Sequence, residues 1–202
     1  MSEAWPGVAE PGNRDAILTA AAALAGSDGP DGPSSGTLAM ALGRSMAGGG
    51  TGARARQELQ VAVVTEAGRI FDEEVVQPAL AAPAGLGQLA TVCEAFFGHL
   101  ERHTCPDGCF MASAALALGT RTGPVRDLII ALQAQFGELI RGFAVTAVAR
   151  NELPPGEDPG RLAFELNGIM LATDTNFVQH EDPAVIDLGR QIVRERLGVG
   201  QP

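Results

Sequence analysis

Four residues with metal-binding side chains lie close together near the middle of the sequence: His99, His103, Cys105 and Cys109. Two histidines four residues apart share one face of a helix, and two thiolates just beyond them would complete a four-ligand zinc site. The spacing matches no common zinc finger, and Cys109 can equally be a small buried hydrophobe. We therefore expect no bound metal, and keep a metal- or thiol-based sensor as an alternative.

A single carboxylate in an apolar helix is the other ionisable group of interest. Asp174 lies among the apolar residues Met170, Leu171 and Phe177 of a predicted helix. Burial among these side chains would raise the pKa of its carboxyl group. With Asn167 and Thr173 it can line a ligand pocket, or face solvent. Because the sequence contains no nucleophile elbow, no His-Glu-x-x-His motif and no usable Ser/His/Asp order, we expect neither an enzyme nor a cofactor.

The run GGGTG at residues 48–52 has the composition of a phosphate-binding loop. Such a loop needs a preceding strand and a following Gly-Lys-Ser/Thr. Here the preceding segment has a helical pattern and the chain contains no lysine. The sequence therefore disfavours a nucleotide site.

Residues 34–60 are locally basic in an acidic chain. They hold Arg44, Arg54 and Arg56 against Glu58, while the whole chain has a formal net charge of -10. The overall charge disfavours non-specific coating of nucleic acid, and 4% aromatic residues disfavour a binder that stacks single-stranded bases. A small basic face on an acidic body still suits phosphate contact.

These side chains must be positioned by helices, because apolar residues recur at helical spacing and alternating β-branched runs are absent. We expect an all-α fold of about nine helices, with Pro78 ending the long one. Three cysteines suggest reduced thiols, and the absence of a leader or of an apolar run of about 20 residues suggests a cytoplasmic protein. The expected helices cover residues 13–26, 34–43, 54–77, 86–103, 110–119, 125–147, 161–180 and 183–197, plus one beginning near Ser45.

A two-turn helix, a turn glycine, a serine and a long helix form the outline of a helix-turn-helix unit. In this region and beyond, the chain resembles the tetracycline-repressor (TetR) family of transcriptional regulators over roughly residues 13–197. The matching residues are Arg14, Ile17, Leu18, Ala21, Ala22, Leu24, Ser34, Leu38, Ala39, Leu42, Gly43, Ser45, Arg56, Glu58 and Leu59, together with residues 108–127 and 162–171.

The resemblance implies a homodimeric, ligand-responsive regulator, most simply a repressor that a small molecule releases from its DNA operator. Residues 1–12 would be a tail, 13–60 the DNA-binding domain, whose fourth helix continues to about residue 78, and 61–202 the sensing and dimerisation domain. The last two helices would form the dimer interface. The DNA-binding residues would be Ser34, Arg44, Ser45, Met46, Ala47, Gly49, Gly50, Thr51, Arg54 and Arg56.

A sensing body of this kind holds a pocket between its helices, lined by apolar groups and a few polar ones. Candidate lining residues are Phe96, Leu100, Phe110, Phe136, Phe143, Met170 and Asp174. Their composition suggests a largely apolar effector with one polar group.

The recognition helix departs from the family pattern. Where the family has an aromatic residue, one further residue and then His-Phe, this chain has residues 50–53, Gly-Thr-Gly-Ala. The four glycines within residues 48–52 cost a helix roughly 3 to 4 kcal/mol relative to alanine. A dimeric sensor or partner protein with impaired DNA binding is therefore the first alternative.

Overall fold

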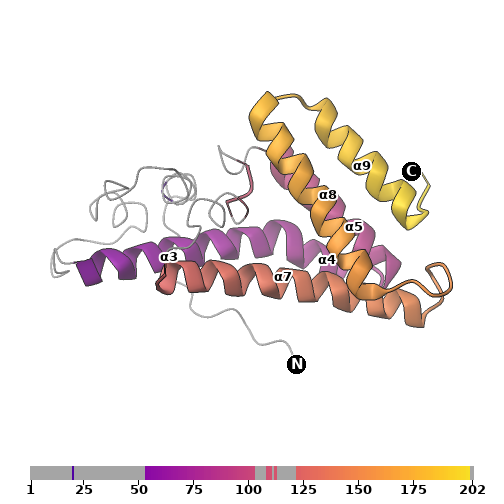
Figure 1. Cartoon of the computed structure of the whole chain (residues 1–202), viewed down its shortest axis with the longest axis horizontal. Coiled ribbons are helices and arrows are strands. Elements are labelled where there is room, and N and C mark those ends of the chain that lie inside the picture. Colours follow the sequence, from indigo (N-terminus) through magenta and orange to yellow (C-terminus); the bar gives the residue numbers. More distant parts are fainter. Residues whose placement is uncertain (1–19, 21–52, 103–107, 111, 113–121, 201–202) are drawn as a thin grey trace. The chain divides into compact units, whose positions relative to one another are not determined.

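The computed structural model describes residues 20, 53–102, 108–110, 112 and 122–200. Over these ranges the chain is helical, with no strand, which confirms the all-α prediction for this part of the molecule (Figure 1). The helices expected at residues 34–43 and after Ser45 lie outside the described residues, and only Ala20 of the first expected helix lies within them.

The chain divides into two compact units. The first comprises residues 1–70 and 105–130, and the second comprises residues 71–104 and 131–202. The chain passes from the first unit to the second between Ile70 and Phe71, near the end of helix α3 (Ala53–Phe71). It crosses again after Thr104 and within helix α7 (Pro124–Ala149).

Helix α3 provides most of the described part of the first unit. Its apolar residues recur at helical spacing, and Val63, Val64, Ala67 and Ile70 are buried. Glu66 is buried on the same helix, where its carboxylate lies 2.6 Å from the guanidinium of Arg69. One helical stripe therefore forms the core-facing side of α3, with a local ion pair satisfying its buried charge.

The helix that begins at Ala53 does not end at Pro78, so that expectation was wrong. After Phe71 the chain makes a π-helical turn, η2 (Asp72–Val76), and continues as helix α4 (Gln77–Ala81). In the wide turn the Gln77 N–H donates to the carbonyl of Asp72, five residues back. Proline lacks an N–H and its ring clashes with the carbonyl four residues earlier in an α-helix. A π turn just before it lets the helical path continue.

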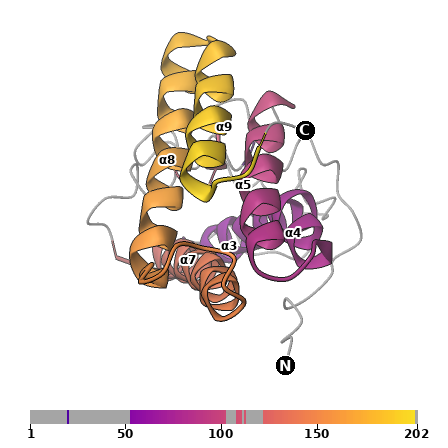
Figure 2. The same ribbon diagram turned by 90° about the vertical axis from the view of Figure 1, so that its right-hand side faces the viewer.

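Helices α5 (Leu86–Glu101), α8 (Pro159–His180) and α9 (Ala184–Leu197) pack together in the second unit, with α4 against α5. Figure 2 shows α8 and α9 side by side. Gly189 of α9 allows close packing with both α8 and α5, because an added Cβ would overlap Thr173 Oγ1 and lie 3.1 Å from Phe97 Cε1. The buried side chains of this unit include Leu89, Val92, Cys93, Phe96, Phe97, Leu100, Ile140, Leu162, Leu166, Met170, Phe177, Ile186, Val193 and Leu197.

Helix ends in the second unit follow standard capping chemistry. Asp158 caps α8 by accepting a hydrogen bond from the Arg161 N–H at 2.7 Å. Glu152 caps α5 from a distant loop, since its Oε2 accepts from the Leu86 N–H at 2.8 Å. This bond, followed by that from Arg150, lowers the pKa of Glu152. A side chain at Gly85 would collide with the same carboxylate, and Gly85 also has a φ of 92°.

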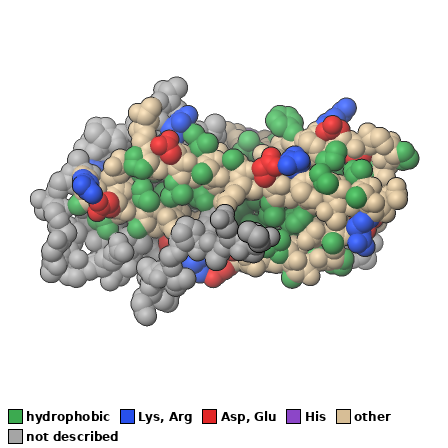
Figure 3. All heavy atoms as spheres, turned by 90° about the horizontal axis from the view of Figure 1, so that it is seen from below, with side chains coloured by type: hydrophobic (Ala, Val, Ile, Leu, Met, Phe, Trp, Pro, Cys, Tyr) green, Lys and Arg blue, Asp and Glu red, His purple; other side chains and the backbone are tan. Residues whose placement is uncertain are grey.

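Helix α7 is long and apolar enough to cross a membrane by length and composition alone. Its outer face carries an ion pair in which Arg141 donates to Glu138 at 2.6 Å, with both side chains largely exposed. The space-filling view from below shows hydrophobic side chains interspersed with neighbouring acidic and basic ones (Figure 3).

Candidate functional site

Of the ten residues predicted to contact DNA, Arg54 and Arg56 are described, in the first turns of α3. The Arg54 side chain is 92% exposed and its Nε lies 3.1 Å from Glu58 Oε1, whereas Arg56 is half-buried. Such exposed pairs contribute about 0 to 1 kcal/mol, so Arg54 can exchange this partner for another anion at little cost. The other predicted contacts, Ser34, Arg44, Ser45, Met46, Ala47, Gly49, Gly50 and Thr51, lie outside the described residues.

Most of the predicted effector-pocket residues belong to the second unit. Five of them are buried there: Phe96, Leu100, Phe143, Met170 and Asp174. Phe136 belongs to the same unit and is half-buried, whereas Phe110 is buried and belongs to the first unit. The assignment of these residues to a pocket stays a prediction.

Phe71, which the sequence interpretation did not select, is the centre of an aromatic cluster. Its ring meets Phe136 at 5.1 Å and Phe96 at 6.4 Å between centroids, both edge-on, and Phe96 meets Phe97 at 6.2 Å. Edge-to-face rings at these distances attract one another beyond the burial of their surface. Two predicted pocket residues, Phe96 and Phe136, are thus connected through the residue that ends α3.

His99 is buried near the end of α5. Its side chain is 4% exposed, its Nδ1 lies 2.6 Å from Glu74 Oε2, and its ring meets Phe71 edge-on at 5.6 Å. Arg102 donates to the same carboxylate oxygen at 3.2 Å. In the part of the chain that the structure describes, no group of three or more His, Cys, Asp and Glu side chains could hold a metal. His103 and Cys105 lie outside that part.

Arg190 joins helix α9 to α5 through an ion-pair cluster. It donates to both carboxylate oxygens of Glu101 at 2.6 and 2.7 Å and to Glu94 at 2.8 Å. These hydrogen bonds lower the pKa of Glu101 and raise that of Arg190. Because the arginine is only 13% exposed and its donors are engaged, it is a structural cation.

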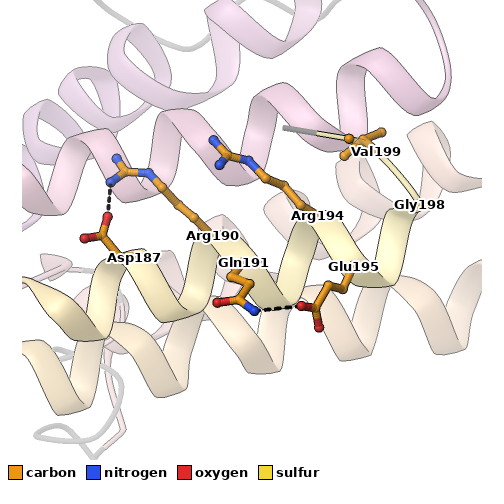
Figure 4. Close-up of a pocket in the computed structure, with 8 residues that line it drawn as sticks. Asp187, Arg190, Gln191, Arg194, Glu195, Gly198 and Val199 are labelled. Carbon is orange, nitrogen blue, oxygen red and sulfur yellow. Dashed lines mark hydrogen bonds and ion pairs between the residues drawn. The ribbon is translucent and has the colours of Figure 1, made fainter. Parts of the chain in front are cut away.

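An open groove runs beside the exposed side of α9. It is lined by Asp187, Arg190, Gln191, Arg194, Glu195 and residues 198–200, as shown in Figure 4. Within it, Asp187 pairs with Arg190 and Gln191 donates to Glu195 at 2.8 Å. Charged and amide side chains of α9 line the groove together with residues 198–200, and it shares no residue with the predicted effector pocket.

Helices α8 and α9 carry the most conspicuous exposed apolar side chains of the second unit. Phe164 is 80% exposed, and Leu171 and Val178 follow it at intervals of seven residues on α8. Leu188 and Ile192, four residues apart, are exposed on α9. Intervals of seven and four keep residues on one side of a helix, so each helix presents an apolar row outside the protomer's core.

The second half of the sequence matches a known family. The model of the tetracyclin repressor-like C-terminal domain covers residues 85–193, more than half of the chain. The chain belongs to the TetR family. The matched part contains α5, α7, α8 and most of α9, which carry Phe96, Phe97 and Phe136 of the aromatic cluster, the Arg190 cluster and the exposed rows. As a member of this family, the TetR-family protein is a ligand-responsive, DNA-binding transcriptional regulator.

Solved structures share the fold of this TetR-family chain. A TetR transcriptional regulator from Chloroflexus aurantiacus J-10-fl superposes with a TM-score of 0.74 at 18% identity, covering 92% of this chain and 93% of that one. AibR, solved in complex with isovaleryl coenzyme A and operator DNA, superposes with a TM-score of 0.61 at 18% identity, covering 92% and 98%. No curated protein matches the sequence.

Proposed function

We propose that this TetR-family regulator is a soluble, cytoplasmic homodimeric repressor that leaves its DNA operator when a small, largely apolar effector binds its second unit. The match of the family model to residues 85–193 carries this conclusion, because it covers the segment that would sense and dimerise. The role is regulatory rather than catalytic.

The dimer would form through α8 and α9. These helices pack against each other and both carry exposed apolar rows, so a second copy would bury Phe164, Leu171, Val178, Leu188 and Ile192. Exposed large apolar side chains on two neighbouring helices are typical of a surface that a partner covers. Two pairs of such helices make a four-helix arrangement whose core positions these side chains occupy.

Operator contact would come from the basic segment before and at the start of α3. Arg54 is exposed and pairs with Glu58 at the surface, which favours exchange for a DNA phosphate. Arg56 lies two residues further on, and residues two apart do not share a helix face, so the two arginines would approach different backbone positions.

The effector would bind beside the aromatic cluster. Phe96, Phe143 and Met170 supply apolar surface and Asp174 supplies a buried polar group in the same unit. A mainly apolar lining with one convergent polar side chain selects a ligand of matching composition. AibR was solved with isovaleryl coenzyme A. The short acyl group of that ligand matches an apolar lining and its charged coenzyme A portion does not, so small compounds with short branched acyl chains are the first set to test.

A mobility-shift assay on DNA flanking the protein's own gene tests this function. We expect a shift at micromolar protein in about 0.1 M salt, reversal by an apolar effector, and weaker binding by Arg54→Ala at all sequences. Glu138→Gln, a surface change on α7, is the control and should bind like the wild type. Absence of any shift by the folded wild type contradicts the proposal and favours a sensor without DNA binding.

A metal- or thiol-based sensor makes a different prediction. It requires bound zinc or a redox-dependent change that disappears in Cys105→Ser and Cys109→Ser. Metal analysis of the purified protein, with these two variants as controls, distinguishes it from a regulator that responds to an organic effector.

A further inference from the structure

The π-helical turn Asp72–Val76 stands at a junction in the chain. The first segment of the first compact unit ends at Ile70, and the first segment of the second unit begins at Phe71, immediately before this turn. π turns are rare, and they occur frequently at functional positions because their backbone can change register locally. Pro78 explains why the turn is wide, since a proline cannot continue the α-helical ladder. It does not explain what holds the turn in place.

Side chains from α5 hold the turn through Glu74. The Glu74 carboxylate is 15% exposed and bonds to the ring of His99 at 2.6 Å and to Arg102 at 3.2 Å. Val75, the next residue, is fully buried. Breaking these bonds is costly, because a largely buried carboxylate that loses its hydrogen-bond partners is left without compensation. The contact therefore favours a single position of the turn against α5.

The same contact is connected to the predicted effector pocket. The ring of His99 packs edge-on against Phe71, and Phe71 packs against Phe96 and Phe136. A ligand that displaces one of these rings must move Phe71 or His99, since interiors are close-packed and side chains have few alternative positions. Moving either residue acts directly on the bond between His99 and Glu74.

We propose that residues 72–76 form a hinge, that Glu74 bound to His99 and Arg102 is its latch, and that effector binding near Phe71 opens the latch. This regulation rests on the proposed function, because the hinge would set the direction in which α3 leads into the DNA-binding segment. The latched state is the one favoured by the effector-free protein. A ligand shifts this equilibrium only through its different affinity for the two states.

Hydrogen–deuterium exchange on the full-length protein tests the hinge without any ligand. In Glu74→Gln we expect amides of residues 72–79 to exchange at least about tenfold faster, the factor for losing one charged hydrogen bond. Amides of residues 89–97 in α5 should change by less than about twofold, because local opening leaves the rest of the unit folded. Glu138→Gln makes the same chemical change in an exposed ion pair and should alter neither segment.

Arg102→Gln provides a milder test if Glu74→Gln folds poorly, because Arg102 is 53% exposed and supplies the longer of the two bonds. We expect an increase of about twofold to threefold, confined to the same amides. Unchanged exchange at residues 72–79, or equal acceleration throughout α5, α8 and α9, overturns the hinge and leaves Glu74 with a general structural role.

The mobility-shift assay then tests the latch as regulation. Because Glu74→Gln opens the latch, it should change the affinity for DNA flanking the protein's own gene by at least about fivefold, the lower end of typical allosteric coupling. Glu138→Gln should bind this DNA like the wild type. Local acceleration of exchange with unchanged DNA affinity refutes the regulatory role. If the wild type itself binds no DNA, the proposed function fails, and the exchange data still decide whether the hinge exists.

Discussion

Replacing Phe164 by alanine should dissociate the proposed dimer without unfolding the protomer. The side chain is 80% exposed in the protomer, so the substitution removes almost no intramolecular packing. Fully burying a phenylalanine contributes about 1.5 to 3 kcal/mol, and four-fifths of this is about 1.2 to 2.4 kcal/mol for each copy. A symmetric dimer buries two copies, which amounts to about 2.4 to 4.8 kcal/mol. The dimer dissociation constant should therefore rise by roughly 60-fold to 3,000-fold.

Sedimentation over a range of protein concentrations measures this constant directly. Leu80→Ala is the matched control, because Leu80 is 47% exposed on α4 and lies outside α8 and α9. It should dimerise like the wild type. Circular dichroism melts at concentrations where both proteins are monomeric should coincide for Phe164→Ala and wild type. A dissociation constant for Phe164→Ala within about threefold of wild type, or a wild type that stays monomeric at about 10 µM, would refute the reasoning.

Three further outcomes follow from the second unit. Gly189→Ala should lower the free energy of unfolding by about 1 to 3 kcal/mol, because the added methyl group overpacks the contact with Thr173 and Phe97. Gly137→Ala on α7 has open space around the new methyl group and should raise the free energy of unfolding by up to about 1 kcal/mol. Denaturant titration of the two variants shows whether their effects have opposite signs. The hydrogen bond from Arg190 lowers the pKa of Glu101 in the folded state below its ordinary value of 4.5. The ion pair therefore stabilises the fold above about pH 4.5, and this stabilisation is lost as the pH falls and Glu101 becomes protonated. Melting temperatures of Arg190→Met should thus decline less steeply than those of wild type below about pH 5, and parallel curves would contradict this. Burial raises the pKa of Cys93 to about 12, so its thiol should resist alkylation at pH 8 until the protein is unfolded, as peptide mass mapping would reveal.

Helical periodicity was enough to place most helices of the second unit. The expected segments 86–103, 125–147, 161–180 and 183–197 correspond to α5, α7, α8 and α9 within a few residues. Apolar spacing and turn residues act locally in the chain, so they can be read without knowing its neighbours. The TetR family could be identified from the sequence because its helices have a recognisable order and spacing. The match of the family model to residues 85–193 confirms this prediction.

The course of the chain around Pro78 could not be read in this way. Proline predicts the end of a helix, but here a π turn stabilised by tertiary contacts carries the helical path to Ala81. Phe71 ends α3 just before this turn, and the rings that surround it come from other helices, so its central place in the aromatic cluster appears only in the tertiary structure. The bond between Glu74 and His99 joins residues 25 positions apart, so no pattern of neighbouring residues could predict it.

The sequence by itself determined the helical class, the positions of the helices in the second unit and the membership of the TetR family, because these depend on local periodicity and motif order. Tertiary structure alone decided which polar side chains meet. It buried His99 against Glu74 and enclosed Arg190 between Glu94 and Glu101, from residues as far as 96 positions apart. It also showed which apolar residues of α8 and α9 the protomer leaves exposed, since every amphipathic helix buries one face and only packing reveals which apolar side chains remain for a partner.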